Sequence, residues 1–98
     1  LKVAEKLAKN TSDKQIQIAL TESYSNLAEI YAFLGKQNEA INYQMKAIEI
    51  QLLLFNEKNI FLAKSYNNIG EFLQTLGNAK EAFDYHIKAR NIQEDLHT

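Results

Sequence analysis

One stretch of this chain is written twice, and that duplication limits the possible folds more than any other feature. Residues 18–51 return as residues 60–93, displaced by 42 positions, and 15 of the 34 aligned residues are identical. Self-similarity at a fixed period of this length is typical of repeat proteins, in which similar units stack in a row. The sequence therefore predicts two copies of one structural unit that lie side by side.

Each copy has the pattern of a helix, a tight turn and a second helix. In the first copy, apolar residues recur at every third or fourth position and form one stripe of a helix, namely Leu20, Tyr24, Leu27, Tyr31 and Leu34. Gly35 follows this stripe and suits the left-handed cap of a helix C-terminus, because it lacks a Cβ atom. The expected helices span about residues 13–34, 38–55, 60–76 and 79–96.

Small residues in the second helix of each copy indicate close packing. Ala40 and Ala47 lie seven residues apart on one helix face, and Ala82 and Ala89 repeat this spacing. Their short side chains let another helix approach closely. Helix 38–55 is also apolar on more than one face, so we expect it to be sandwiched between both flanking helices.

The residues shared by the two copies resemble the tetratricopeptide repeat. In the first copy they are Tyr24, Leu27, Ala28, Tyr31, Gly35, Ala40 and Ala47, and in the second Tyr66, Ile69, Gly70, Leu73, Gly77, Ala82 and Ala89. The period exceeds the usual one of about 34 residues. It is similar to that of the long-helix repeats of kinesin light chains, as is the segment 62–69. These repeats usually carry a proline at the helix start, and here Asn59 and Ile60 must begin the helix by side-chain capping instead.

This resemblance implies an all-α fold, a right-handed α-solenoid of stacked antiparallel helix hairpins. We expect residues 1–98 to form a single tetratricopeptide domain fragment, with residues 1–9 as the second helix of a preceding repeat and repeats at 13–55 and 58–97. Ser12 and Gln15 have the spacing of a capping box at the start of the first full repeat.

The last helix is expected to close the stack, or nearly so. Four apolar positions of the earlier copy become charged or polar in it: Ile48, Leu52, Leu53 and Phe55 correspond to Arg90, Glu94, Asp95 and His97. Solenoids need terminal units with a polar outer face. The alternative is a diverged inner repeat, with a further unit packed beyond Thr98.

Composition and charge exclude several classes of function. The formal net charge is -1, with 11 basic and 12 acidic residues interspersed, so neither nucleic acid nor an anionic membrane is an expected partner. The chain has no cysteine, which removes disulfides, thiol catalysis and cysteine zinc sites. It also has no apolar run long enough to span a membrane. The default location is therefore the cytoplasm.

The sequence predicts no catalytic, metal or cofactor site. His86 and His97 are the only histidines, and neither has a second ligand at helical spacing. Because His86 aligns with Gln44, we expect His86 to lie on a helix surface. Ser23 and Ser65 recur, but no histidine recurs with them to act as a base.

The candidate site is a surface on the first helix of each copy. The faces that do not turn inward present Glu22, Ser25, Asn26, Glu29 and Phe33 in the first copy and Lys64, Asn67, Asn68, Glu71 and Thr75 in the second. The resemblance implies that these residues line a concave face, where asparagines at the positions of Asn26 and Asn68 hydrogen-bond the backbone of an extended peptide. An amide suits this role, since it both donates and accepts. The alternative is that each amide ties its own repeat to the neighbouring helix.

The expected function is that of a non-catalytic protein–protein interaction module that binds an extended peptide or a partner protein in the groove. A carboxylate clamp for an acidic peptide end is disfavoured, because Lys64 is the only basic candidate in the groove. Two other classes stay open. The repeats are purely architectural and self-associate through an exposed solenoid end, or they are the sensor or recruitment part of a larger enzyme or transcription regulator.

Overall fold

The computed structural model describes residues 14–54 and 59–96, and in these ranges the chain forms α-helices and no strand. The helices are α2 (Lys14–Phe33), α3 (Gln37–Leu54), α4 (Ile60–Thr75) and α5 (Ala79–Leu96). The predicted boundaries of these four helices lie within one residue of the observed ones. The helix expected at residues 1–9, the capping residue Ser12, and the end positions Phe55 and His97 lie outside the described residues.

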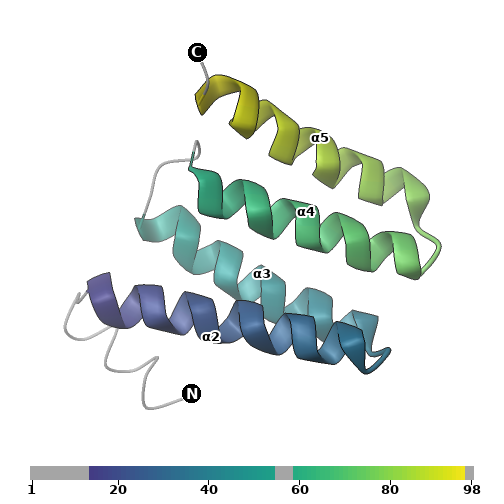
Figure 1. Cartoon of the computed structure of the whole chain (residues 1–98), viewed down its shortest axis with the longest axis horizontal. Helices are drawn as coiled ribbons and strands as arrows, with labels where there is room; N and C mark the ends of the chain where they lie inside the picture. The colour runs from purple at the N-terminus through teal and green to yellow at the C-terminus, as the bar shows by residue number, and fades with distance from the viewer. Residues whose placement is uncertain (1–13, 55–58, 97–98) are drawn as a thin grey trace.

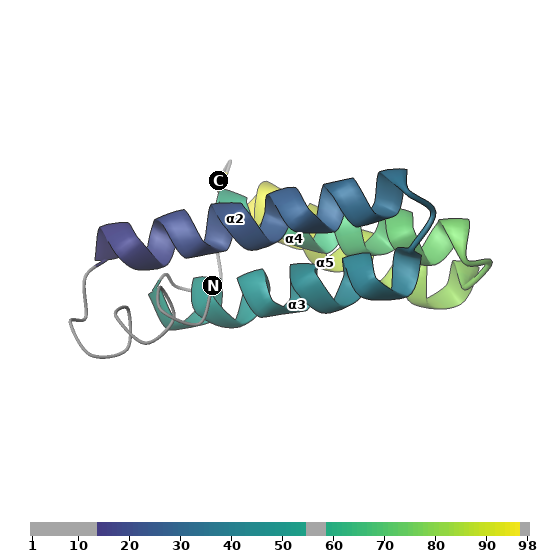
Figure 2. The ribbon, with the colours of Figure 1, turned by 90° about the horizontal axis from the view of Figure 1, so that it is seen from below.

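The helices form two antiparallel hairpins that pack side by side. Helix α2 packs on α3, α4 packs on α5, and α3 joins the two hairpins by packing on α4. Helices α2 and α4 run in the same direction (Figure 1), and α2 and α3 lie in two separate layers (Figure 2). The predicted fold class, an all-α stack of antiparallel helix hairpins, is confirmed.

Glycine ends the first helix of each hairpin, as predicted. Gly35 and Gly77 have φ values of 81° and 88°, in the left-handed region that favours glycine. The backbone N–H of Lys36 donates to the carbonyl of Tyr31 at 2.8 Å, and that of Gly35 donates to Ala32 at 3.0 Å. This is the Schellman pattern, which satisfies carbonyls at the helix end that have no partner within the helix.

Replacing Gly35 with alanine is expected to lower the free energy of unfolding by about 1 kcal/mol. A Cβ atom at this position would meet no atom within 4 Å, so the loss comes from the backbone conformation alone. Urea denaturation would measure it, with Lys36→Ala as the control for a change in the same turn. An unchanged midpoint for Gly35→Ala would contradict the prediction.

The start of α4 confirms the predicted side-chain cap. Asn59 has extended backbone angles, and its Oδ1 accepts a hydrogen bond from the backbone N–H of Leu62 at 2.8 Å. This bond satisfies one of the free N–H donors at the helix N-terminus, so α4 begins with a side-chain cap in place of the proline that the long-helix repeats usually carry.

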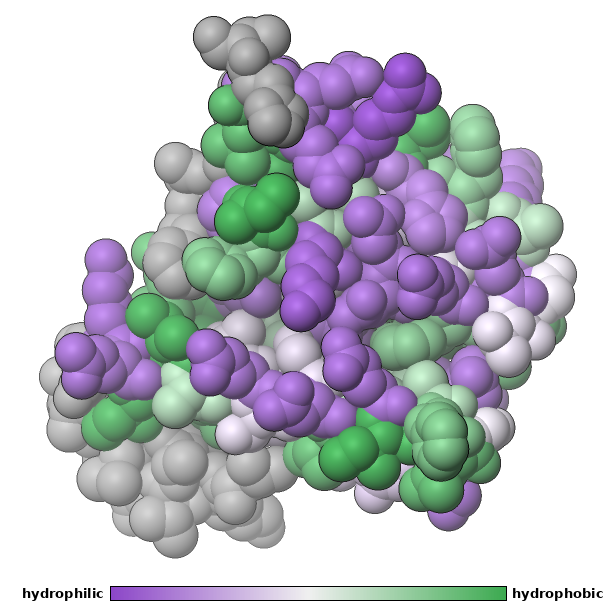
Figure 3. Space-filling view, viewed as in Figure 1, coloured by the Kyte–Doolittle hydropathy of each residue, from purple (hydrophilic) through white to green (hydrophobic). Residues whose placement is uncertain are grey.

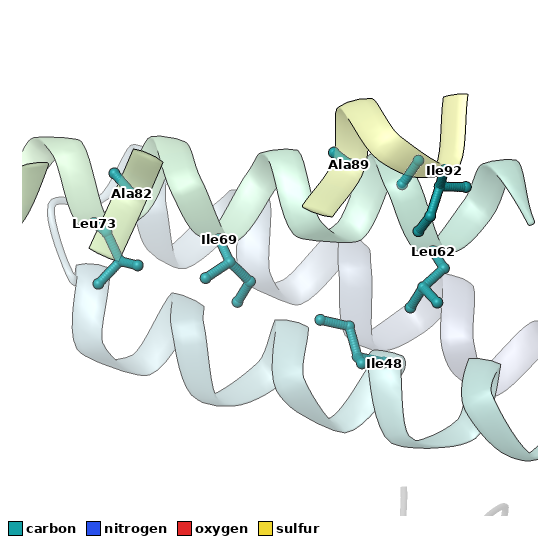
Figure 4. Close-up of a cluster of buried hydrophobic side chains, with 8 residues drawn as sticks. Ile48, Leu62, Ile69, Leu73, Ala82, Ala89 and Ile92 are labelled. Atoms are coloured by element: carbon teal, nitrogen blue, oxygen red, sulfur yellow. The ribbon is translucent and has the colours of Figure 1, made fainter. Parts of the chain in front are cut away.

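The core consists of three clusters that the small residues bring together. The largest cluster joins α3, α4 and α5 (Figure 4) through Ile48, Leu62, Ala63, Ile69, Leu73, Ala82, Ala89 and Ile92. A second joins α2 and α3 through Leu20, Tyr24 and Ala47. In the third, Phe72 of α4 contacts Ala28 of α2 and Ala40 of α3, so one aromatic ring connects the two hairpins.

Several apolar residues that were expected to be buried are exposed. Leu34 is exposed, and so are Leu52 and Leu53 on α3, with Leu53 exposed to 85%. Helix α3 does pack between its two flanking helices, α2 and α4, as predicted, but these two helices leave Leu52 and Leu53 exposed. Helix α4 covers only one face of α3, which includes Ile48, and the two leucines lie away from it.

The exposure of Leu52 and Leu53 also weakens the prediction that α5 closes the stack. Of the described positions that turn polar in the last helix, only Arg90 replaces a residue that the next hairpin covers, namely Ile48. Arg90 is exposed and pairs with Glu94 one turn away, at 2.9 Å. That α5 closes the stack stays a prediction.

Candidate functional site

A groove of about 340 Å³ lies between α2 and α4, with α3 as its floor. We call it the α2–α4 groove, and its lining residues are Ile18, Thr21, Glu22, Ser25, Asn26, Glu29, Gln51, Phe61, Lys64, Ser65 and Asn68. Figure 3 shows this side of the molecule, on which hydrophilic residues cover the centre, where α2 and α4 lie next to each other. Most of the residues that line the groove are therefore polar or charged.

Six of the ten predicted site residues line this groove, and four do not. Phe33 is 91% exposed and lies beyond the end of the groove in an apolar patch with Ile30 and Leu34. Asn67 contacts His86 of α5 instead. Glu71 and Thr75 are exposed farther along α4, where the Thr75 hydroxyl donates to the Glu71 backbone carbonyl at 3.2 Å.

Five residues of the groove were not predicted from the sequence. Three of them are polar and lie low in it, namely Thr21, Gln51 and Ser65, which are all buried. The other two are the apolar residues Ile18 and Phe61 at one end. A signal for the buried polar residues was present, because Ser65 and Gln51 are each identical to their counterpart in the other copy.

A buried hydrogen-bond network forms the floor of the groove and connects the two hairpins. The Gln44 side chain is fully buried, and its Nε2 donates to the hydroxyls of Ser25 at 3.1 Å and Ser65 at 3.0 Å. The Ser65 hydroxyl donates in turn to Gln51 Oε1 at 2.9 Å. Asn68 Nδ2 completes the set by donating to Gln44 Oε1 at 3.2 Å. We call these residues the Gln44 network.

The alignment with Gln44 predicted a helix-surface position for His86, yet Gln44 itself is buried. Its amide is buried because α4 crosses the face of α3 that carries it, and both hairpins supply hydrogen-bond partners. A buried amide is tolerated when its donors and acceptor are satisfied in this way.

The two matched asparagines have different surroundings. Asn68 is half-buried and gives one hydrogen bond to Gln44, so its amide does tie α4 to the neighbouring hairpin. Asn26 is exposed, and its amide has no hydrogen-bond partner among the described residues. The structural alternative thus applies in part to Asn68, whereas it does not apply to Asn26.

Comparison with known families agrees with this geometry. Models described as tetratricopeptide repeat match residues 21–52 and residues 62–97, one for each hairpin. The chain belongs to the tetratricopeptide repeat family. Proteins of this family are generally protein–protein interaction modules and are typically non-catalytic. A comparison with curated proteins found no match.

The second tetratricopeptide hairpin differs from the first at the positions that correspond to Gln44 and Ala28. His86 replaces it and is half-buried, with Nδ1 3.0 Å from Asn67 Oδ1 and Nε2 3.1 Å from Gln74 Oε1. Its ring lies over Gly70, where a Cβ atom would stand 2.6 Å from Nε2. The first hairpin has Ala28 at the position of Gly70, so histidine occurs with glycine and glutamine with alanine.

This pairing predicts that Gly70 and His86 are energetically coupled. Gly70→Ala alone must displace the imidazole, which offsets the gain of about 1 kcal/mol in helix propensity. In the His86→Gln background the same change should show that full gain. Thermal or urea unfolding of the four proteins of this double-mutant cycle would give a coupling energy of at least about 0.5 kcal/mol. Additive effects would contradict the prediction.

Other kinds of site find no support in the part of the chain that the structure covers. Residues 14–54 and 59–96 contain no group of three or more histidine, cysteine, aspartate or glutamate side chains placed to hold a metal ion. Among the same residues, none of the helices has the length and hydropathy needed to cross a bilayer.

Proposed function

We propose that the α2–α4 groove of this tetratricopeptide domain binds an extended segment of a partner protein, without catalysis. One observation carries the proposal. Asn26 and Asn68 are identical in the two copies and line the same groove from opposite helices, and the Asn26 amide is not used within the described structure.

The chemistry of the two amides suits an extended main chain. A peptide in this conformation presents N–H and C=O groups in alternation, and an asparagine amide both donates to and accepts from them. Asn26 offers both groups. Asn68 uses its Nδ2 to bond Gln44, which holds the side chain in place and leaves its carbonyl oxygen to accept from a ligand.

Replacing both asparagines with alanine is expected to weaken peptide binding by about 1 to 3 kcal/mol, one modest hydrogen bond for each amide. The probes are peptides that the wild-type protein selects from a random twelve-residue library, and isothermal titration calorimetry gives their affinities. Asn42→Ala, an exposed asparagine on α3 outside the groove, is the matched control and should leave affinity unchanged.

Each single variant separates binding from stability. Asn26→Ala should weaken binding and leave thermal unfolding unchanged, because its amide has no partner to lose among the described residues. Asn68→Ala should also lower stability by about 1 kcal/mol, since it breaks the bond to Gln44. Unchanged affinity together with lost stability in the double variant would show that the amides are structural, and the proposal would be wrong.

An architectural role is the second candidate, and one observation favours it. Ile30, Phe33 and Leu34 form an exposed apolar patch at the C-terminal end of α2, visible at the lower right of Figure 3. A contiguous apolar patch of this kind is typical of a protein contact. Sedimentation at several concentrations tests it, because self-association that disappears in Phe33→Ser would favour assembly over peptide binding.

A further inference from the structure

We infer that the segment bound in the α2–α4 groove carries a lysine or arginine about five residues from an apolar side chain. The inference rests on the proposed function and states the chemical class of its ligand. It follows from three features of the groove, namely the placement of its charges, the apolar residues at one end, and the length between them.

We call a pair of matched positions on α2 and α4 a level of the groove. At one level the two residues carry opposite charges, and at another level both residues are acidic. Glu22 of α2 and Lys64 of α4 occupy matched positions, 42 residues apart, so their charges offset each other. One level farther along, Glu29 lines the groove, and its match on α4 is Glu71, which is exposed beside the groove. No described residue forms an ion pair with either carboxylate.

This acidic level attracts a cation and repels an anion. A ligand ammonium or guanidinium group can pair with the Glu29 carboxylate, which forms no ion pair with a described residue. The nearest groove cation, Lys64, lies at the other level and is matched with Glu22. A basic ligand residue therefore fits at Glu29.

The opposite end of the groove suits an apolar side chain. Ile18 and Phe61 line it and remain exposed, to 37% and 58%. Contact with an apolar ligand residue would remove part of this surface from water, which is favourable. The amides of Asn26 and Asn68 lie between the two ends, where the ligand main chain passes.

The length of the groove sets the spacing of the two ligand residues. Ile18 and Glu29 are eleven positions apart on one helix, which corresponds to about 16 Å along its axis. An extended chain advances about 3.3 Å per residue, so about five residues span this distance. The spacing is the same for either direction of the ligand chain along the groove.

Selection from a random twelve-residue peptide library tests the inference. We expect enriched peptides to carry lysine or arginine four to six positions from a leucine, isoleucine, phenylalanine or other large apolar residue. Resynthesised peptides should bind Glu29→Gln about threefold more weakly than the wild type, and Glu29→Lys about tenfold more weakly. Their affinity for the wild type should also fall as sodium chloride is raised. Glu39→Gln, an exposed carboxylate on α3 outside the groove, is the matched control.

The outcomes separate this inference from the proposed function. Enriched peptides that are acidic or uncharged, with affinities that fall in Asn26→Ala and stay unchanged in Glu29→Gln, would overturn the inference and leave peptide binding in the groove intact. A library without enriched peptides, or affinities that Asn26→Ala does not change, would overturn the proposed function and the inference with it.

Discussion

Replacing Phe72 with alanine is expected to lower the free energy of unfolding by about 3 to 5 kcal/mol. The ring comes from α4, is 6% exposed, and packs on Ala28 of α2 and Ala40 of α3. Its removal leaves a cavity between the two hairpins, because the two alanines are too small to fill the space. Urea denaturation followed by far-ultraviolet circular dichroism would measure the loss.

The repeat itself supplies the control for this experiment. Ile30 stands 42 residues earlier at the matched position of α2, where it is 55% exposed. Ile30→Ala should change stability by less than about 1 kcal/mol, because no hairpin covers that side of α2 in the described structure. Equal losses in the two variants would mean that Phe72 does not join the hairpins as described.

The second large effect is expected at the floor of the groove. Gln44→Met keeps the length of the side chain but removes its amide, so Ser25, Ser65 and Asn68 each lose a partner. Leaving buried polar groups unpaired lowers stability by about 1 to 3 kcal/mol. The loss stays within this range because Ser65 keeps its bond to Gln51 and half-buried Ser25 can turn toward water.

Two further variants identify the cause of that loss. Gln93→Met, at the counterpart of Gln51 in the last helix, should leave stability within about 0.5 kcal/mol, because it is half-buried and has no partner among the described residues. Adding Ser65→Ala to Gln44→Met should increase the loss, since the buried side-chain carbonyl of Gln51 then also loses its hydrogen-bond donor. A stable Gln44→Met protein would show that the amide contributes little to the contact between the hairpins.

The regular features of the fold were predictable because they depend on local chemistry. The 42-residue period predicted two equal hairpins, and the periodic apolar residues with Gly35 and Gly77 predicted where each helix ends. The presence of Asn59 likewise predicted the side-chain cap at the start of α4. Each of these signals acts through neighbours in the chain, so a single sequence contains them.

The features that were not predicted depend on which side of a helix the next hairpin covers. Phe72 and Ile30 hold matched positions, yet only Phe72 has a hairpin against it. Gln44 looks like a surface residue because a glutamine is normally hydrated, and its burial depends on partners supplied by two other helices. Helical spacing predicts which residues share a face, and it does not predict what covers that face.

The same limit explains the mixed result for the candidate site. Spacing placed Asn26 and Asn68 on the correct faces of their helices. It did not predict that Asn67 turns toward His86, or that Phe33 lies beyond the groove. The cytoplasmic location, the binding of a protein or peptide partner and the closed end of the stack stay predictions.

The Gln44 network has a consequence for how the hairpins can be aligned. Sliding α4 along α3 by one helical turn, about 5.4 Å, would carry Ser65 and Asn68 away from Gln44 and bury its amide opposite groups that cannot bond it. An apolar contact alone would tolerate such a shift far better, because apolar packing has no fixed direction. The polar layer thus selects a single offset between the hairpins, and that offset fixes the distance between the Asn26 and Asn68 amides on the two walls above it.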